Sequence, residues 1–332
     1  MRDADFTLWR DHTGWASMGP LAAIPRIPKQ LAIMWRTAFH ISARRPDLVV
    51  LVDYGVFNLR LASTLRRRLH YTGPILDLFP PGTWLDNAQK AREVSTLTVP
   101  VTAFAHQYAF YRQLGLNVAY FGHPLAGSYE MRPPRAAPSG AAGTVAVLPG
   151  SRSEELRRHL PRLALAYRTL QTRRPHLRAV FGAADERAEE DIARAAERYE
   201  LAGTRVVRGV SAAVADADAA WVASGTAVLE CVLSGVPAVA LYVITPWLVK
   251  HGRKLIKHRF IALPNLVLGR ELVPELLQEE ATPQRLADEM ERILEDPSRQ
   301  YAAFPELRTA LGSSDALAQC AQFAVELARD AR

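Results

Sequence analysis

Two short glycine-containing loops carry residue types that suit a diphosphate. They span Leu148–Arg152 and Ala223–Thr226, and each follows an apolar run and precedes a helical pattern. Glycine lets the backbone approach a ligand, a helix N-terminus attracts anions, and the Arg152 guanidinium can donate two hydrogen bonds to one phosphate. Either loop alone also fits an ordinary strand-to-helix turn, with Ser151 as the capping residue. At the carboxyl ends of strands in one sheet, the pair can hold a diphosphate between them.

Two carboxylates are candidates for contact with sugar hydroxyl groups. Asp53 ends the apolar run 48–52, where the carboxyl end of a parallel strand faces a ligand crevice, so it is placed to act as a general base. Capping of the following helix is an equally compatible role for Asp53. Glu230 lies one turn into the helical pattern after the second loop. It is a candidate acceptor for a sugar or ribose hydroxyl, with a helix-surface carboxylate as the alternative.

The sequence predicts no metal ion and no cofactor. Asp216 and Asp218 have the spacing of metal-dependent sugar transferases, but they precede the apolar run 219–223, at the end of a strand that does not bind ligands. No other acidic cluster accompanies them in the sequence. Cys231 and Cys320 are far apart, without metal-ligand spacing, which is typical of free thiols in a reducing cytoplasm.

Short apolar runs alternate with helical patterns, and this alternation predicts an α/β fold with a parallel sheet in each half of the chain. The proline- and glycine-rich stretch 127–143 is expected to be a linker. We predict two Rossmann-like domains that face a cleft, at 1–126 and 144–312, followed by a helix at 313–332. The expected strands are 48–52, 75–79, 96–103, 118–121, 145–148, 179–182, 205–207, 219–223 and 238–243.

The charge of the chain fits either an anionic partner or a solvated basic surface. Its 332 residues carry a formal net charge of +7, and the segment 247–259 combines a basic flank with an apolar face. This segment fits a helix on an anionic membrane surface or a solvated helix; nucleic acid is not expected, because no recognition motif accompanies it. The helix expected at 29–43 either packs on the core or contacts lipid. With no signal peptide and no apolar run of about 20 residues, we expect a soluble or peripheral protein.

Together, these segments resemble the lipid-A-disaccharide synthase family of glycosyltransferases. The resemblance runs from Met18 to the end of the chain and is most specific over 263–279. The matching pieces are Arg45-Pro46-Asp47-Leu48, Asp53, Phe57-Asn58, Gly122-His123-Pro124-Leu125-Ala126, the two glycine loops with Glu155 and Glu230, Leu263-Pro264-Asn265-Leu266 and Gly269–Glu279.

The resemblance implies a GT-B fold, in which two Rossmann-like domains enclose the active site. It implies inverting transfer of a diacylglucosamine from its UDP derivative to the 6-hydroxyl of a diacylglucosamine 1-phosphate. Asp53 would be the base, and Arg152 with the helix N-termini at Gly150 and Gly225 would stabilise the leaving diphosphate. The expected binding residues are Asn58, Trp84, His123, Gly150, Ser151, Glu155, Ser224, Gly225, Thr226, Glu230, Asn265, Arg270, Glu275, Gln278 and Glu279.

The resemblance also implies partners and a location. The N-terminal domain would bind the lipid acceptor, a phosphorylated glycolipid, and the C-terminal domain would bind the UDP-activated acylated glucosamine. The enzyme would be cytoplasmic and peripheral on the cytoplasmic face of the inner membrane. We also consider a homodimer.

Departures from the family fall in the domain expected to bind the acceptor. The family's opening strand and Gly-Glu-Ala-Ser-Gly-Asp loop have no counterpart here, which predicts an incomplete first domain. Val56 stands where the family has a second aspartate, and only Pro81 and Trp84 remain of its Ser-Pro-x-Val-Trp-Ala-Trp-Arg stretch. An active synthase and a non-catalytic or acceptor-changed UDP-sugar-binding paralogue at the membrane are both open. A UDP-N-acetylglucosamine 2-epimerase or a peptidoglycan-precursor glucosaminyltransferase fits the run 263–279 less well.

Overall fold

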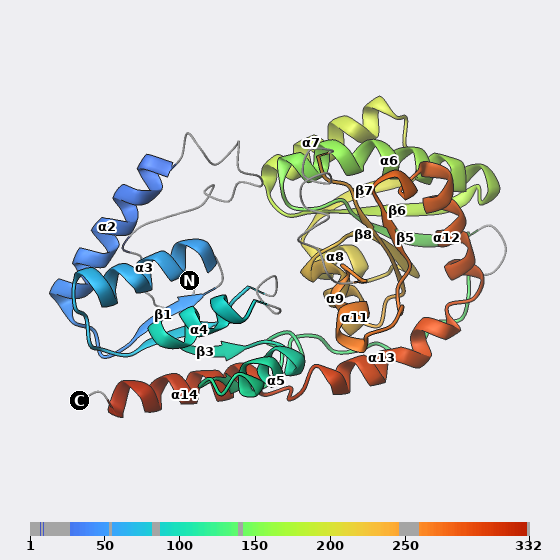
Figure 1. Ribbon diagram of the computed structural model, residues 1–332. Helices are drawn as coiled ribbons and strands as arrows, with labels where there is room; N and C mark the ends of the chain where they lie inside the picture. Colours follow the sequence, from blue (N-terminus) through green and yellow to red (C-terminus); the bar gives the residue numbers. More distant parts are fainter. Residues whose placement is uncertain are drawn as a thin grey trace.

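The computed structural model describes residues 7, 9, 27–52, 55–81, 87–138, 142–245 and 259–330. They form two α/β lobes (Figure 1). The chain leaves the first lobe near Gly122 and returns to it near Gly312, and an antiparallel bridge joins these two glycines. Gly122 has φ 112°, and a Cβ atom there would lie 2.8 Å from the Ser313 nitrogen. The close approach of the two crossing segments therefore requires glycine.

The first lobe contains a four-stranded parallel sheet in the order β1-β2-β3-β4. Its strands are short, and helices connect them, as parallel pairing requires. Its elements are α2 (Ile27–Arg44), β1 (Val49–Val52), α3 (Gly55–Arg68), β2 (Ile75–Leu78), α4 (Ala88–Leu97), β3 (Val99–Thr102), α5 (Ala105–Gln113) and β4 (Ala119–Tyr120).

Two details of the first lobe differ from the sequence prediction. The expected strand 96–103 begins only at Val99, because α4 continues to Leu97. The Thr96 and Thr98 hydroxyls donate to carbonyl oxygens one helical turn earlier, at 2.7 and 2.8 Å, which satisfies the end of the helix. In β1 the burial alternates instead of being continuous, because successive side chains point to opposite faces of the sheet and only one face is covered there in the described part of the chain.

The second lobe contains a six-stranded parallel sheet in the order β10-β9-β8-β5-β6-β7. Its strands are β5 (Ala142–Leu148), β6 (His176–Ala183), β7 (Thr204–Arg208), β8 (Ala219–Ala223), β9 (Ala238–Tyr242) and β10 (Glu275–Leu277). Its helices are α6 (Ser153–Arg173), α7 (Glu186–Arg198), α8 (Val210–Val214), α9 (Thr226–Leu233), α11 (Leu263–Leu268), α12 (Pro283–Glu295) and α13 (Ser298–Ala310), with a 3-10 turn at Gln278–Glu280.

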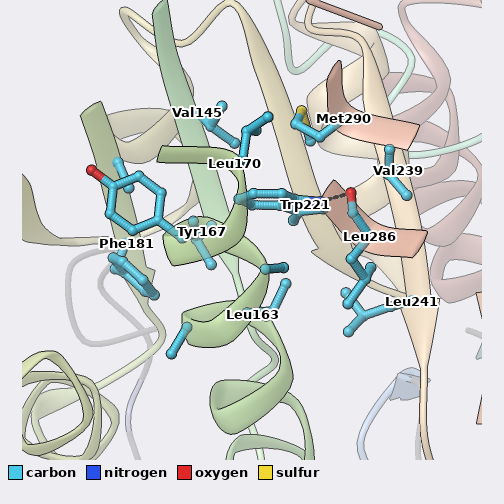
Figure 2. Packing of buried hydrophobic residues seen from close by; sticks show 14 of the residues in the cluster. Val145, Leu163, Tyr167, Leu170, Phe181, Trp221, Val239, Leu241, Leu286 and Met290 are labelled. Atoms are coloured by element: carbon cyan, nitrogen blue, oxygen red, sulfur yellow. Dashed lines mark hydrogen bonds between the residues drawn. The ribbon is translucent and has the colours of Figure 1, made fainter. Parts of the chain in front are cut away.

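Trp221 is at the centre of the larger core of the second lobe. Its indole lies in β8 among side chains of α6 and α12 and of neighbouring strands, and it is fully buried (Figure 2). The indole N–H donates to the carbonyl oxygen of Leu286 at 2.9 Å, so burial leaves no polar atom of this side chain unsatisfied. Helices cover both faces of this sheet, which explains why β8 is buried at every position.

The last helix, α14 (Ala316–Asp330), packs against the first lobe and not against the second. Its Cys320 joins Leu76 of β2 and Val101 of β3 in a small core, with Phe323 against Phe121 at 5.5 Å between ring centroids. Figure 1 shows this red helix below the first sheet. The first lobe is therefore completed by a segment from the other end of the sequence.

Candidate functional site

A cavity of about 600 Å³ opens at the carboxyl edge of the second sheet. The cavity lies where β5 adjoins β8, which is the point where the strand order reverses. From β5 the chain continues to β6 and β7 on one side, and β8 and β9 extend the sheet on the other side. Such switch points are where doubly wound sheets bind ligands. Its lining includes eight of the predicted residues, namely Gly150, Ser151, Arg152, Glu155, Ser224, Gly225, Thr226 and Glu230.

Glu155, and not Ser151, satisfies the start of α6. Its carboxylate accepts hydrogen bonds from the backbone N–H groups of Ser151 (3.1 Å) and Arg152 (3.3 Å). Its second oxygen lies 2.7 Å from the guanidinium of Arg152, whose side chain is 48% exposed at the rim of the cavity. Gly150 has φ 116°, and a Cβ atom there would lie 2.6 Å from Glu155. The loop thus presents an arginine held in place by a carboxylate that also engages two of the loop's N–H groups.

His159, which the sequence analysis did not single out, connects the first glycine loop to the end of β9. Its Nδ1 lies 2.7 Å from the carbonyl oxygen of Pro149, and its Nε2 accepts from the N–H of Val243 at 3.0 Å. Because a carbonyl only accepts and an N–H only donates, the ring is neutral with its proton on Nδ1. Burial lowers the pKa of His159, which agrees with this neutral form.

The second glycine loop leads into α9 and leaves the start of that helix open. Gly225 precedes the helix, and no side chain caps the first turn. The Ser224 N–H donates to Leu241 at 2.8 Å, which fixes the loop on the sheet, but the buried Ser224 hydroxyl has no partner among the described residues. An open helix N-terminus beside an unsatisfied hydroxyl is a site for an anion with several oxygen atoms.

Glu230 follows one turn into α9 and lines the same cavity. Its Oε2 accepts a short hydrogen bond from the hydroxyl of Tyr129, a residue of the segment that joins the two lobes. Burial and this hydrogen bond raise the pKa of Tyr129. No local sequence pattern predicts this contact, because 101 residues separate the two side chains.

The five predicted residues of the run 263–279 do not line the cavity. Asn265 is fully buried and bonds to the backbone of Leu272 and Val273, and it donates to Glu275 at 2.7 Å. Glu275 in turn accepts from the N–H groups of Ile261 (2.9 Å) and Ala262 (3.0 Å). These residues position the cavity wall, since Ile261 and Leu263 do line it.

The other members of that run are also engaged elsewhere or outside the cavity wall. The Arg270 guanidinium forms an ion pair with Glu306 on α13, on the exposed surface. Gln278 accepts from the N–H of Ile244 at 3.3 Å. Glu279 belongs to the short 3-10 turn after β10. In this structure none of these three side chains lines the cavity.

Of the predicted residues in the first lobe, two lie in described segments. Asn58 of α3 is buried and donates to the carbonyl oxygen of Val52 at 3.2 Å. His123 lies at the crossing between the lobes, where its Nδ1 accepts from the N–H of Leu125 at 3.1 Å. Burial lowers the pKa of His123 to about 4. Asp53, Trp84 and nearly all of the basic segment 247–259 lie outside the described residues.

Neither a metal cluster nor a membrane span is found in the described ranges. No group of three or more His, Cys, Asp or Glu side chains in those ranges could hold a metal ion. Asp218 accepts from the N–H of Thr144 at 2.8 Å, at the amino edge of the sheet and away from the cavity. Every helix in that part of the chain is too short or too polar to cross a membrane.

The sequence matches the family described as lipid-A-disaccharide synthetase over residues 1–321. The lipid-A-disaccharide synthase of Myxococcus xanthus is 35% identical over 326 residues, which cover 93% of this chain and 83% of that protein. The synthase of Syntrophus aciditrophicus is 32% identical over 338 residues, covering 98% and 88%. These matches confirm the resemblance inferred from the sequence motifs.

Solved structures of low sequence identity share the fold. The UDP-N-acetylglucosamine 2-epimerase of Neisseria meningitidis, bound to UDP-N-acetylglucosamine, aligns with a TM-score of 0.62 and 11% identity over 90% of this chain and 81% of that one. A trehalose-phosphate synthase of Burkholderia vietnamiensis aligns with a TM-score of 0.54 and 17% identity over 91% and 79%. Such neighbours are GT-B glycosyltransferases and epimerases, which confirms the predicted fold class.

Proposed function

Because this chain belongs to the lipid-A-disaccharide synthetase family and is a glycosyltransferase of lipid A biosynthesis, we propose a specific reaction for it. It transfers 2,3-diacylglucosamine from the UDP derivative to the 6-hydroxyl of 2,3-diacylglucosamine 1-phosphate. The hydroxyl oxygen attacks the anomeric carbon, the bond to UDP breaks, and a base takes up the hydroxyl proton. One displacement inverts the anomeric carbon, so the product is a β-1,6-linked disaccharide phosphate.

The cavity at the switch point carries the donor side of this proposal. The open N-terminus of α9 and the unsatisfied Ser224 hydroxyl lie in the same cavity as the Arg152 guanidinium. A diphosphate placed between them would meet a partial positive charge on one side and a full one on the other. Charge that develops on the leaving UDP would be stabilised by groups already in position, which is the usual source of a large rate enhancement.

The proposed base is Asp53, and its support comes from its place in the chain. In the sequence, Asp53 comes directly after the last residue of β1 and shortly before α3. The carboxyl edge is where parallel sheets present ligand-binding groups. Its neighbour along the chain, Asn58, is held by the carbonyl oxygen of Val52, which fixes the start of α3 against the end of β1.

We further propose that the protein is peripheral on an anionic membrane through α2. The side chains Ile27, Leu31, Trp35 and Phe39 recur every four residues on this helix, and all are exposed. Lys29 and Arg36 flank this apolar stripe. An exposed apolar stripe with an interfacial tryptophan and basic flanks is the pattern of a helix that lies in a membrane surface. Figure 1 shows α2 at the outer end of the first lobe, away from the second.

Product formation by the purified chain tests the reaction, with UDP binding measured on the same sample. Asp53→Asn should abolish disaccharide formation and leave the Kd for UDP unchanged, because the proposed base does not contact the nucleotide. Asp216→Asn is the matched control, since Asp216 is largely exposed and its carboxylate lies 3.7 Å from Arg205, away from the cavity. UDP binding without product in the wild type would support the non-catalytic paralogue instead, and full turnover by Asp53→Asn would remove Asp53 as the base.

A further inference from the structure

Glu230, which lines the cavity, is contacted by a residue from outside the sheet. Tyr129 belongs to the segment between β4 and β5, and its hydroxyl donates to Oε2 of Glu230. The backbone carbonyl of Tyr129 accepts from the Arg308 guanidinium on α13. The half-buried phenol is therefore held through its own backbone as well as through its hydroxyl.

The contact leaves one carboxylate oxygen of Glu230 available. Oε2 is taken by Tyr129, whereas Oε1 has no hydrogen-bond partner among the residues that the structure describes. Glu230 lines the cavity, so this oxygen can accept from a ligand hydroxyl. A carboxylate that is anchored through one oxygen presents the other in a fixed direction and loses less rotamer entropy on binding.

We propose that Tyr129 is a positioning residue, whose phenol orients Glu230 to accept from the ribose hydroxyl groups of the uridine nucleotide. This inference rests on the proposed function, which places a UDP-activated sugar in the cavity. Burial and the bond to Glu230 raise the pKa of Tyr129, so the phenol stays protonated and remains a donor at neutral pH. Tyr129 thereby makes the ribose subsite depend on the segment between the lobes.

Ribose selectivity gives a measurement that a merely structural tyrosine would not affect. Binding of UDP and of 2′,3′-dideoxy-UDP is measured by calorimetry for the wild type and for Tyr129→Phe, which removes one oxygen atom. Loss of one oriented hydrogen bond is worth about 0.5–1.5 kcal/mol. The ratio of the affinity for UDP to the affinity for 2′,3′-dideoxy-UDP should therefore be about 2- to 10-fold lower in Tyr129→Phe than in the wild type. The affinity for 2′,3′-dideoxy-UDP should stay the same, and in turnover the KM for the donor should rise while kcat is unchanged.

Two further variants separate orientation from general stability. Tyr301→Phe is the matched control, because the Tyr301 hydroxyl accepts from the N–H of Arg135 on the same lobe, away from the cavity. The Tyr301→Phe variant should keep the wild-type preference for UDP over 2′,3′-dideoxy-UDP. In a Glu230→Ala background, Tyr129→Phe should have no further effect on selectivity, since the group it orients is gone.

Each outcome is decisive for one proposal or the other. An unchanged UDP preference in Tyr129→Phe, with UDP still bound, would overturn the role of Tyr129 and leave the proposed function intact. A loss of selectivity of equal size in the Glu230→Ala background would also overturn it, because Tyr129 would then act independently of Glu230. Failure of the wild type to bind UDP at all would defeat the proposed function itself.

Discussion

The imidazole of His159 lies 2.7 Å from the carbonyl oxygen of Pro149, so the second turn of α6 holds the loop at the start of the same helix. His159→Leu fills a similar volume but leaves the Pro149 carbonyl and the Val243 N–H without partners. Each unsatisfied buried group costs about 1–3 kcal/mol, so the free energy of unfolding should fall by roughly that amount or twice it. UDP affinity should fall as well, because the loop that carries Arg152 is released. Urea unfolding and calorimetry measure both effects.

A matched control for this variant is His176→Leu, at an exposed position at the start of β6. It should leave both the unfolding free energy and the Kd for UDP unchanged. Equal stability of His159→Leu and the wild type would show that the two hydrogen bonds do not hold the loop.

Asp77 should make the stability of the first lobe depend on pH. The side chain is 2% exposed, and burial raises its pKa to about 7. The pKa in the unfolded chain is about 3.9, so between these values the folded state binds the proton more tightly and unfolding releases it. The native state is therefore destabilised as the pH rises from about 4 to about 7, by up to ~4 kcal/mol in total.

The Asp77→Asn variant removes this titration and tests its sign. Urea unfolding gives the free energy of unfolding of the variant minus that of the wild type. This difference should be larger at about pH 8 than at about pH 5. A stability difference that is the same at both values would show that the Asp77 carboxyl does not titrate in this range.

Removal of Arg152 should weaken nucleotide binding by more than a surface charge is worth. Arg152→Ala takes away a phosphate donor and also leaves the Glu155 carboxylate, 2.7 Å from the lost guanidinium, without its counter-charge in the cavity. We expect the Kd for UDP to rise at least about tenfold and turnover to fall further, because charge grows on the leaving diphosphate. Arg157→Ala is the control, since Arg157 pairs with Glu154 on the exposed face of α6. Equal UDP affinity of Arg152→Ala and the wild type would exclude Arg152 from the phosphate site.

The apolar stripe of α2 should govern attachment to lipid. Trp35→Glu puts a charge in the middle of the stripe, and burial of a side chain of this size is worth about 1.5–3 kcal/mol, so binding to vesicles should fall about tenfold or more. Sedimentation with vesicles that contain phosphatidylglycerol measures this binding. Leu165→Glu is the control, because Leu165 is similarly exposed on α6 of the other lobe. An equal loss of vesicle binding in Trp35→Glu and Leu165→Glu would mean that the apolar stripe of α2 does not attach the protein to lipid.

The fold was predictable from the sequence where strands are continuous apolar runs between helices. β8 coincides with the expected run 219–223, since a strand covered on both faces must be apolar throughout. The prediction was weaker in the first lobe, where β4 comprises only two residues and β3 starts late. There, threonine hydroxyls that extend α4 compete with the β propensity of the same residues.

The candidate site was predictable where its residues adjoin strand ends, as in the two glycine loops. Tyr129 and His159 carry no such local signal, because their partners are distant in the sequence. Tyr129 bonds to Glu230, which is 101 residues away, and His159 bonds to Val243, which is 84 residues away. Asn265 and Glu275, predicted from the family pattern, hold the segment at Ile261 and Ala262 through buried hydrogen bonds in this structure. A motif alone does not distinguish a residue that touches a ligand from one that supports the wall around it.

The packing of α14 on the first sheet has a consequence for biosynthesis. Residues 121–315 lie between β4 and α14, and at ~5–20 residues per second their translation takes roughly 10–40 s. During that interval Leu76 and Val101, fully buried in the finished protein beside Cys320, have no cover from α14. The nascent first lobe therefore exposes this apolar face to solvent while the second lobe is being made.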